Sequence, residues 1–263
     1  MNKMLKIIFL FQKEGLGNTL RFIIKKLFIR KINNYKKYQG LFYDKKGIEI
    51  GGPSNIFNKD NILPIYSVIN GLDGVNFSTM TIWEGVLKKG ENYKYDRGRR
   101  VGYQYICDVV DLNMIPSEKY DFGLSCNTLE HIANPFRAIN ELLRVIKPNG
   151  ILLSVLPRKE SNFDHKRETT TLDHLKDDYN HNVEEDDLSH LDEILKLHDL
   201  SMDPAAGTLE QFKTRSVKNY ENRALHHHVF DMNLLRDIYN YFNIEIIFTD
   251  TIMTDYIIVG RKR

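Results

Sequence analysis

The side chains best suited to chemistry lie in a short loop, 126–131, which contains Asn127, Glu130 and His131. The loop follows Phe122–Cys126, a short apolar run with the character of a buried parallel strand. An amide, a carboxylate and an imidazole offer hydrogen bonds, and an imidazole can also take up a proton near neutral pH. Because ligands of α/β sheets bind at the carboxyl ends of the strands, we expect a ligand site at this loop.

The residues after this loop predict a helix and a second strand. Asn134 can cap a helix, and Pro135 fits the first turn because its missing N–H costs nothing there. An apolar stripe follows at three- and four-residue spacing: Phe136, Ile139, Leu143 and Ile146. A turn at 147–150 and a buried strand at 151–156 complete a right-handed βαβ unit.

Size and composition indicate one large α/β domain with an insertion. The 263 residues are 42% hydrophobic and 27% charged, which is an ordinary globular balance. Cys107 and Cys126 both fall in predicted buried strands, so we interpret them as reduced core thiols. No apolar run approaches the roughly 20 residues that span a bilayer, and Ile7–Phe11 is too short for a secretory signal. We therefore expect a cytoplasmic protein.

The N-terminal region is strongly basic. Met1–Lys46 holds twelve Lys and Arg residues and two acidic ones, interleaved with apolar residues, which predicts a basic amphipathic helical extension over residues 1–44. Such a helix can pack on the domain with its basic face in water, the interpretation we favour, or lie on the anionic inner face of a membrane. A nucleic-acid partner is not expected, because the rest of the chain is net acidic.

The βαβ unit resembles the class I S-adenosylmethionine (SAM) methyltransferases. Asn127–His131 matches their (N/D)-x-L-E-H turn, and Ile146–Gly150 is similar to their L-(K/R)-P-(G/N)-G turn. The resemblance implies SAM as the cofactor and a Rossmann-like fold: a seven-stranded, mostly parallel sheet with an antiparallel last strand. It covers a SAM-binding core at 45–157 and a helix and β-hairpin at 229–263.

On this resemblance, the first strand carries the loop for the methionine part of the cofactor. Gly51 and Gly52 would make the close approach, and Glu49 would position the loop or bind the ammonium group. Ser54 would hydrogen-bond the amino-acid part or cap a short helix. Pro53 and Ser54 depart from the glycine-rich pattern of the family.

The resemblance also implies contacts to the nucleoside. Asn76 stands at the end of the second strand, where the family has a carboxylate for the ribose, and an amide lacks that charge. Asp108 would accept the adenine amino group, the Val109 N–H would meet a ring nitrogen, and Asn127 would close the cofactor site. We expect 88–100, which is polar and without periodicity, to be a surface loop.

The segment 158–228 is too long for a connection and carries helical periodicity after an acidic run at 184–187, so it predicts a helical lid for substrate. The methyl group of SAM is already activated, so the protein must only align a nucleophile and remove its proton. His131 is the first candidate base, although it can instead brace its loop, and His227 and His228 follow. Three groups of residues could in principle bind a metal ion: His165 with Asp164, His190 with Asp187, and the triple histidine at 226–228. None has a spacing diagnostic of a metal site, so no metal site is expected and metal binding stays a side hypothesis.

Together these features predict a SAM-dependent O-methyltransferase that acts on a small polar acceptor. The lid and the basic N-terminal region resemble methyltransferases of bacterial surface-polysaccharide (capsule or lipopolysaccharide) pathways. That resemblance implies a sugar hydroxyl, a nucleotide-linked sugar, or a phosphate or phosphoramidate group as acceptor. A nicotinamide-dependent oxidoreductase is disfavoured because G-x-G-x-x-G is missing. A degenerate methyltransferase domain that serves as a binding subunit remains an alternative, because Pro53 and Asn76 depart from the pattern.

Overall fold

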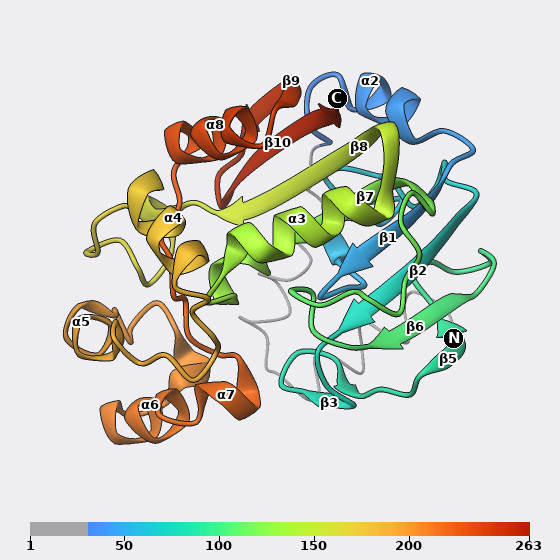
Figure 1. Ribbon diagram of the computed structural model, residues 1–263. Coiled ribbons are helices and arrows are strands. Elements are labelled where there is room, and N and C mark those ends of the chain that lie inside the picture. The colour runs from blue at the N-terminus through green and yellow to red at the C-terminus, as the bar shows by residue number, and fades with distance from the viewer. Residues whose placement is uncertain (1–30) are drawn as a thin grey trace, which may run out of the picture.

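A computed structural model describes residues 31–263, and its central feature is an eight-stranded sheet in the order β5-β6-β2-β1-β7-β8-β10-β9 (Figure 1). The strands of this sheet are β1 (Lys46–Ile50), β2 (Gly71–Asn76), β5 (Gly90–Tyr93), β6 (Gly102–Ile106), β7 (Tyr120–Cys126), β8 (Ile146–Pro157), β9 (Ile244–Thr251) and β10 (Asp255–Lys262). The five strands β6, β2, β1, β7 and β8 run parallel, and β10 is antiparallel to both β8 and β9. The predicted α/β, Rossmann-like class with an antiparallel last strand is therefore confirmed.

Two details of the predicted sheet are wrong. The sheet has eight strands and not seven, because β5 lies within the predicted loop 88–100 and pairs antiparallel with the edge strand β6. An edge strand offers free backbone N–H and C=O groups, so a polar segment can pair with it without any apolar periodicity of its own. The strand predicted to contain Cys107 is β6, which ends at Ile106 and leaves Cys107 beyond it. The strands β3 (Met80–Thr81) and β4 (Gly85–Val86) form a separate small hairpin.

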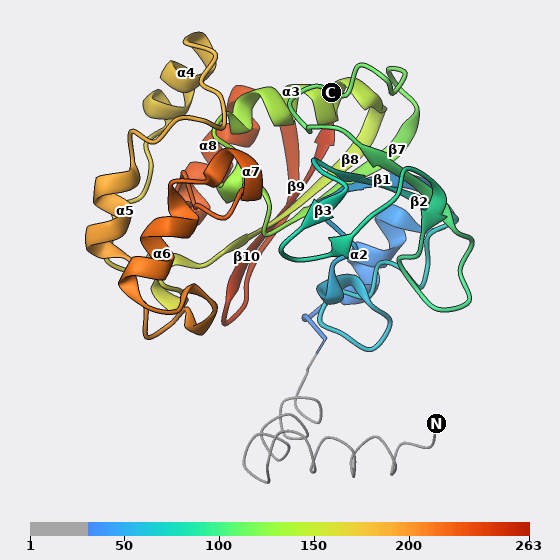
Figure 2. The same cartoon turned by 90° about the horizontal axis from the view of Figure 1, so that it is seen from below.

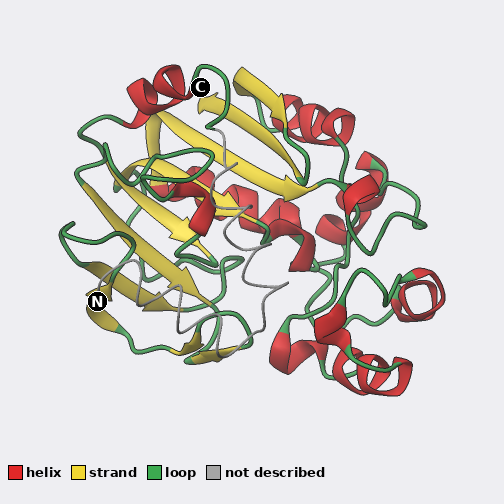
Figure 3. Cartoon of the chain, turned by 180° about the vertical axis from the view of Figure 1, so that it is seen from behind, coloured by secondary structure: helices red, strands yellow, loops and turns green. Residues whose placement is uncertain are grey.

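Helices cover both faces of the sheet, as Figures 1 and 3 show. On one face, α3 (Pro135–Val145) and α8 (Met232–Tyr241) pack against alternate strand residues such as Ile48 and Ile50. On the other face, α2 (Tyr35–Phe42) and the segment 57–69 pack against Phe122 and Leu124. Successive strand side chains point to opposite faces of the sheet, so both faces are covered by packing. The carboxyl edge of the sheet is left free to form a ligand site.

The start of α3 is as the sequence predicts. The Asn134 side chain accepts a hydrogen bond from the Arg137 N–H at 3.1 Å, and Pro135 is the first helical residue. The end differs, because the helix stops at Val145 and Ile146 already pairs with Tyr120 as the first residue of β8. The prediction placed Ile146 on the buried helical stripe, and its side chain is buried as a residue of β8 instead.

The segment between β8 and α8 contains six short helices, which gather beside the carboxyl end of β8 (Figures 1 and 2). They are η3 (Lys159–Ser161), α4 (Leu172–Asn180), α5 (Leu191–Leu197), η4 (Pro204–Ala206), α6 (Leu209–Ser216) and α7 (Asn219–Asn222). Ile194, Ala206, Phe212 and Leu225 form a small hydrophobic core within it. We call this segment, 158–228, the insertion.

Residues 1–30 of the predicted basic extension lie outside the described residues, and its remainder, 31–44, contains α2, whose Tyr38 and Phe42 are buried in the core. Within residues 31–263, no helix has the length and apolar character needed to cross a membrane. The proposed contact with a membrane surface stays a prediction.

Candidate active site

A cavity of about 470 Å³ opens at the carboxyl edge of the sheet. The ends of β1, β2, β6, β7 and β8 line it through Gly51, Asn76, Asp108, Asn127 and Pro157. Trp83, Phe163 and His226 line it from other segments. This is the place where the parallel strands of an α/β sheet present their loops to a ligand.

The turn after β1 requires glycine at Gly51. Its φ is +71°, in the left-handed region, and a Cβ there would lie 2.5 Å from Thr128 Oγ1. The Gly51 N–H donates to Val75 O at 2.9 Å, which ties the turn to β2. Gly51 and Ser54 line the cavity, whereas Gly52 does not. A Cβ on Gly52 would lie 2.3 Å from the carboxyl carbon of Glu49, so Gly52 serves close packing behind the turn.

Glu49 supports this turn from behind and does not line the cavity. Its buried carboxylate accepts hydrogen bonds from the hydroxyls of Tyr66 and Tyr93, both at 2.6 Å, and from the Ser54 N–H at 3.1 Å. Burial raises the pKa of Glu49, while these three donors oppose that change. Of the two roles expected for Glu49, this geometry fits the positioning of the loop.

The side chains expected near the nucleoside already have protein partners. Asn76 Nδ2 donates to Gly52 O at 3.2 Å, so the amide braces the glycine turn. Asp108 Oδ1 accepts a hydrogen bond from the Val110 N–H at 3.2 Å, and Asp108 Oδ2 accepts one from Arg223 Nη2 at 2.8 Å. Val109 lies beside Asp108 in the cavity wall. Arg223 comes from the insertion, so the insertion contacts the sheet directly at the expected adenine carboxylate.

The loop after β7 brings His131 to the cavity. Asn127 has a φ of +47°, and the short η2 helix (Leu129–His131) follows. His131 Nδ1 lies 3.0 Å from Leu225 O, and donation to this carbonyl leaves the lone pair on Nε2. Burial lowers the pKa of His131 well below its ordinary value, and the neighbouring His226 lowers it further. His131 is therefore a neutral imidazole.

His226 is the member of the triple histidine that lines the cavity. Its Nδ1 lies 2.5 Å from Asp164 Oδ2, and Arg167 Nη1 holds the other carboxylate oxygen at 3.2 Å. Burial opposes the charged imidazole, but Asp164 raises the pKa of His226 above its ordinary value. A buried carboxylate fixes the ring orientation and leaves Nε2 as the proton-accepting atom.

Glu130 completes this group. Glu130, His131 and His226 each offer one ligand atom within 4.8 Å of the others. Both carboxylate oxygens of Glu130 are buried and, within residues 31–263, accept no hydrogen bond. Burial raises the pKa of Glu130 to about 7, although the charge of His226 opposes this change. An unpaired carboxyl that titrates near neutrality and two imidazoles thus surround one point of the cavity wall.

His227 and His228 do not line the cavity. His227 Nε2 lies 2.9 Å from Asn219 Nδ2, and His228 Nε2 lies 3.1 Å from Ala133 O. The sequence could not separate three consecutive histidines, because neighbouring side chains of an extended chain point in different directions. The sequence suggested Asp164 and the triple histidine only as possible metal ligands and gave no role to Arg223, because only the folded insertion brings His226, Asp164 and Arg223 to the cavity.

The topology and the cavity define an α/β protein of the Rossmann-like class with its ligand site at the carboxyl edge of the sheet. Residues 72–154, which run from β2 into β8, match the model of a family described as "Methyltransferase domain". The match indicates a methyltransferase domain in this part of the chain and implies SAM as the cofactor. No curated protein matches the sequence.

Solved structures resemble the chain over most of its length at low identity. A SAM-dependent methyltransferase from Methanosarcina mazei is 16% identical, with 89% of this chain and 99% of that chain covered and a TM-score of 0.46. A SAM-dependent methyltransferase from Thermotoga maritima, described as a possible histamine N-methyltransferase, is 14% identical, with 98% and 99% covered and a TM-score of 0.44. One from Aquifex aeolicus is 13% identical, with 88% and 90% covered and a TM-score of 0.41.

Proposed function

We propose that this protein is a SAM-dependent methyltransferase that methylates a hydroxyl group of a small polar acceptor, with His226 as the general base. The observation that carries the proposal is the Asp164–His226 pair, which meets Glu130 and His131 at the wall of a cavity at the carboxyl edge of the sheet. A methyltransferase-domain match over residues 72–154 supports the reaction class.

The residues present fit the cofactor. The cavity volume of about 470 Å³ lies in the ordinary range of ligand sites. The left-handed turn at Gly51 brings backbone against the cavity, and Asp108 and Val109 offer a carboxylate and an N–H on its wall. When bound, SAM supplies a methyl group on a sulfonium, which needs no further activation. Asp108 would hold the adenine amino group and Gly51 the methionine part, as the sequence motifs predict.

The chain itself supplies the proton acceptor. A hydroxyl is a weak nucleophile until its proton is removed, so a base within hydrogen-bond reach speeds the transfer. His226 Nε2 takes the proton, and Asp164 stabilises the imidazolium that forms, as a carboxylate does for a catalytic histidine. His131 is neutral and tied to Leu225 O, so it positions the acceptor by its lone pair rather than taking the proton.

Polar and aromatic groups support a sugar-like acceptor. Trp83 is 49% exposed, lines the cavity and has its ring 4.9 Å from that of His131. Asn162 adds an amide to the same wall. A flat apolar ring beside hydrogen-bonding groups suits the mixed surface of a sugar. A sugar hydroxyl, free or nucleotide-linked, or a phosphate or phosphoramidate group in the biosynthesis of capsule or lipopolysaccharide is the acceptor class we propose.

The first test is cofactor binding by calorimetric titration. We expect micromolar binding of SAM and a loss of about 1–3 kcal/mol in the Asp108→Ala variant, because a partly buried charged acceptor is removed. Asp111→Ala, in the same loop, is the matched control. Binding of NADH without binding of SAM would instead indicate an oxidoreductase, and binding of neither ligand would indicate a degenerate domain.

The second test is methyl transfer to a panel of sugars and nucleotide-sugars. We expect His226→Ala to lower kcat about 10²–10⁴-fold while SAM affinity is retained, because only proton transfer is lost. His181→Ala, on an exposed residue of the insertion, is the control. Unchanged turnover in His226→Ala would overturn the role of His226 as base.

A further inference from the structure

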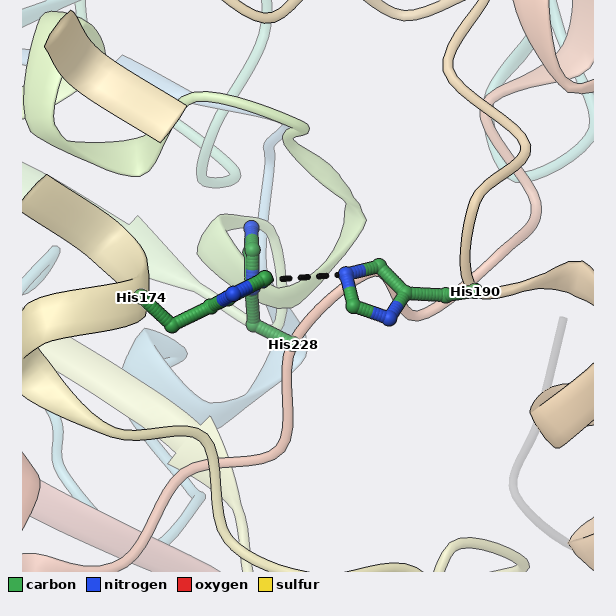
Figure 4. A group of neighbouring side chains, drawn as sticks. All are labelled: His174, His190 and His228. Atoms are coloured by element: carbon green, nitrogen blue, oxygen red, sulfur yellow. Dashed lines mark hydrogen bonds between the residues drawn. The ribbon is translucent and has the colours of Figure 1, made fainter. Parts of the chain in front are cut away.

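A second group of histidines lies away from the cavity, where the insertion meets the core. His174 is on α4, His190 immediately precedes α5, and His228 lies in the extended segment before α8. One ring nitrogen of each lies within 4.8 Å of the other two. Figure 4 shows the three rings converging from three separate segments of the chain. None of the three lines the cavity.

The spacing of the rings fits a shared metal ion. His174 Nε2 and His190 Nε2 are 3.0 Å apart, the contact dashed in Figure 4. Two imidazole nitrogens bound to one tetrahedral zinc ion at about 2.0–2.1 Å lie about 3.3 Å apart. The two nitrogens therefore sit close to the separation that a common ion would impose.

A carboxylate lies beside two of the three rings. Asp178 Oδ2, one helical turn after His174, is 3.3 Å from His174 Nε2 and 3.7 Å from His228 Nε2. This oxygen is buried and, among the described residues, accepts no hydrogen bond. A buried carboxylate oxygen without a donor is costly unless a cation compensates it. Asp178 thus places a buried carboxylate beside the three imidazoles, although it lies outside the group whose ligand atoms are all within 4.8 Å of one another.

The surroundings hold these rings as metal ligands are held in known sites. His228 Nε2 donates to Ala133 O at 3.1 Å, which leaves a lone pair on Nδ1, a buried atom with no hydrogen-bond partner. His190 Nδ1 lies 3.8 Å from Glu193 Oε2, which is near but beyond hydrogen-bond distance. A carbonyl or carboxylate behind a histidine fixes its tautomer and strengthens it as a ligand.

We propose that His174, His190 and His228 bind one divalent transition-metal ion of the zinc class, with the Asp178 carboxylate beside them to offset its charge. The three rings come from separate segments and none lines the cavity, so the role of the ion is structural. It joins α4, the start of α5 and the segment that carries His226. The partial exposure of His174 and His190 leaves a path for the ion to enter.

The test uses the full chain and zinc alone. The protein is stripped with a chelator, returned to Zn²⁺, dialysed, and its zinc content is measured by mass spectrometry. We expect one equivalent in the wild type, less than 0.1 equivalent in H174A/H190A, and at least about tenfold weaker binding in Asp178→Asn. His181→Ala and His226→Ala are the controls and keep the full equivalent. Circular dichroism verifies that each variant is folded.

Cobalt substitution of the wild type gives an independent readout that needs no variant. We expect the intense visible absorption of tetrahedral Co²⁺, displaced by one equivalent of Zn²⁺. The proposal is overturned by less than half an equivalent of zinc in the wild type, or by a weak octahedral cobalt spectrum. It is also overturned if His226→Ala loses zinc while H174A/H190A retains it, which would place the ion at the cavity. None of these readouts depends on methyl transfer.

Discussion

At the scale of single residues, the environment of each ionisable group decides its role. Three acidic side chains show this: Glu49 is held by two tyrosine hydroxyls, Asp164 by His226 and Arg167, and Glu130 accepts no hydrogen bond within residues 31–263. Burial raises the pKa of both glutamates, that of Glu130 to about 7, whereas His226 and Arg167 hold the pKa of Asp164 below its ordinary value. Identical carboxyl groups thus serve as a brace, an orienting partner and a titrating group.

Glu130 should make the stability of the protein depend on pH. Its pKa rises from an ordinary value of 4.5 to about 7 in the folded state, so the folded state binds the proton more tightly. Between these values the free energy of unfolding falls as pH rises, and the full loss is reached above pH 7. In Glu130→Gln this loss, up to about 3 kcal/mol, should disappear.

The measurement is urea denaturation of both proteins between pH 4.5 and pH 8. The advantage of the variant over the wild type should grow with pH across this window. The exposed Glu168→Gln is the control and should give a constant difference. A difference that is also constant for Glu130→Gln would contradict the raised pKa.

At the scale of elements, α3 links the candidate site to the insertion. Its N-cap residue has two functions, because Asn134 Oδ1 accepts the Arg137 N–H while Asn134 Nδ2 donates to Asp178 O at 3.0 Å. The first contact starts the helix that follows the His131 loop, and the second holds α4 against it. One side chain therefore joins an element of the core to an element of the insertion.

Asn134→Ala should lower the free energy of unfolding by about 1–2 kcal/mol, because a capped N–H and a cross-element hydrogen bond are both lost. Asn134→Ser keeps a cap acceptor but cannot replace the amide donor, so it should recover part of this loss. Urea denaturation of the two variants measures the difference. Equal destabilisation by Ala and Ser would show that the cap contributes little.

At the scale of the whole molecule, Arg223 connects the insertion to the sheet. Its guanidinium contacts Asp108 Oδ2 and Glu185 Oε1, both at 2.8 Å, and lies 5.1 Å from the centre of the Phe77 ring. Arginine suits this position because its planar fork can bind two carboxylates at once. The insertion is held at the cavity by this contact and by the hydrogen bond between His131 Nδ1 and Leu225 O.

Arg223→Ala should loosen the insertion without unfolding the sheet. We expect hydrogen exchange in α6 and α7 to become about tenfold faster, which corresponds to about 1.4 kcal/mol in local opening, while β1 and β7 keep their protection. Mass-spectrometric hydrogen exchange on the intact chain measures both regions. Lys213→Ala, on the exposed side of α6, is the control and should leave hydrogen exchange unchanged. Unchanged exchange in Arg223→Ala would contradict the role of Arg223 in holding the insertion to the sheet.

The sequence by itself determined the βαβ unit of β7, α3 and β8, the capped start of α3, helix α8 and the parallel sheet with its antiparallel C-terminal strand. These features depend on local periodicity, caps and turns, which a linear pattern records. The turn at Gly51 and the loop at Asn127–His131 were also located, because both follow strands directly. The cofactor and catalytic roles given to these residues remain predictions.

Only the tertiary structure decided which side chains of the insertion reach the site. The sequence paired His165 with Asp164 and His190 with Asp187, but the fold places Asp164 beside His226 and groups His190 with His174 and His228. It also turned His227 and His228 away from the cavity and paired a polar segment with the sheet as β5. These contacts join residues tens of positions apart, and local sequence carries no record of them because they depend on how the helices of the insertion pack on the core.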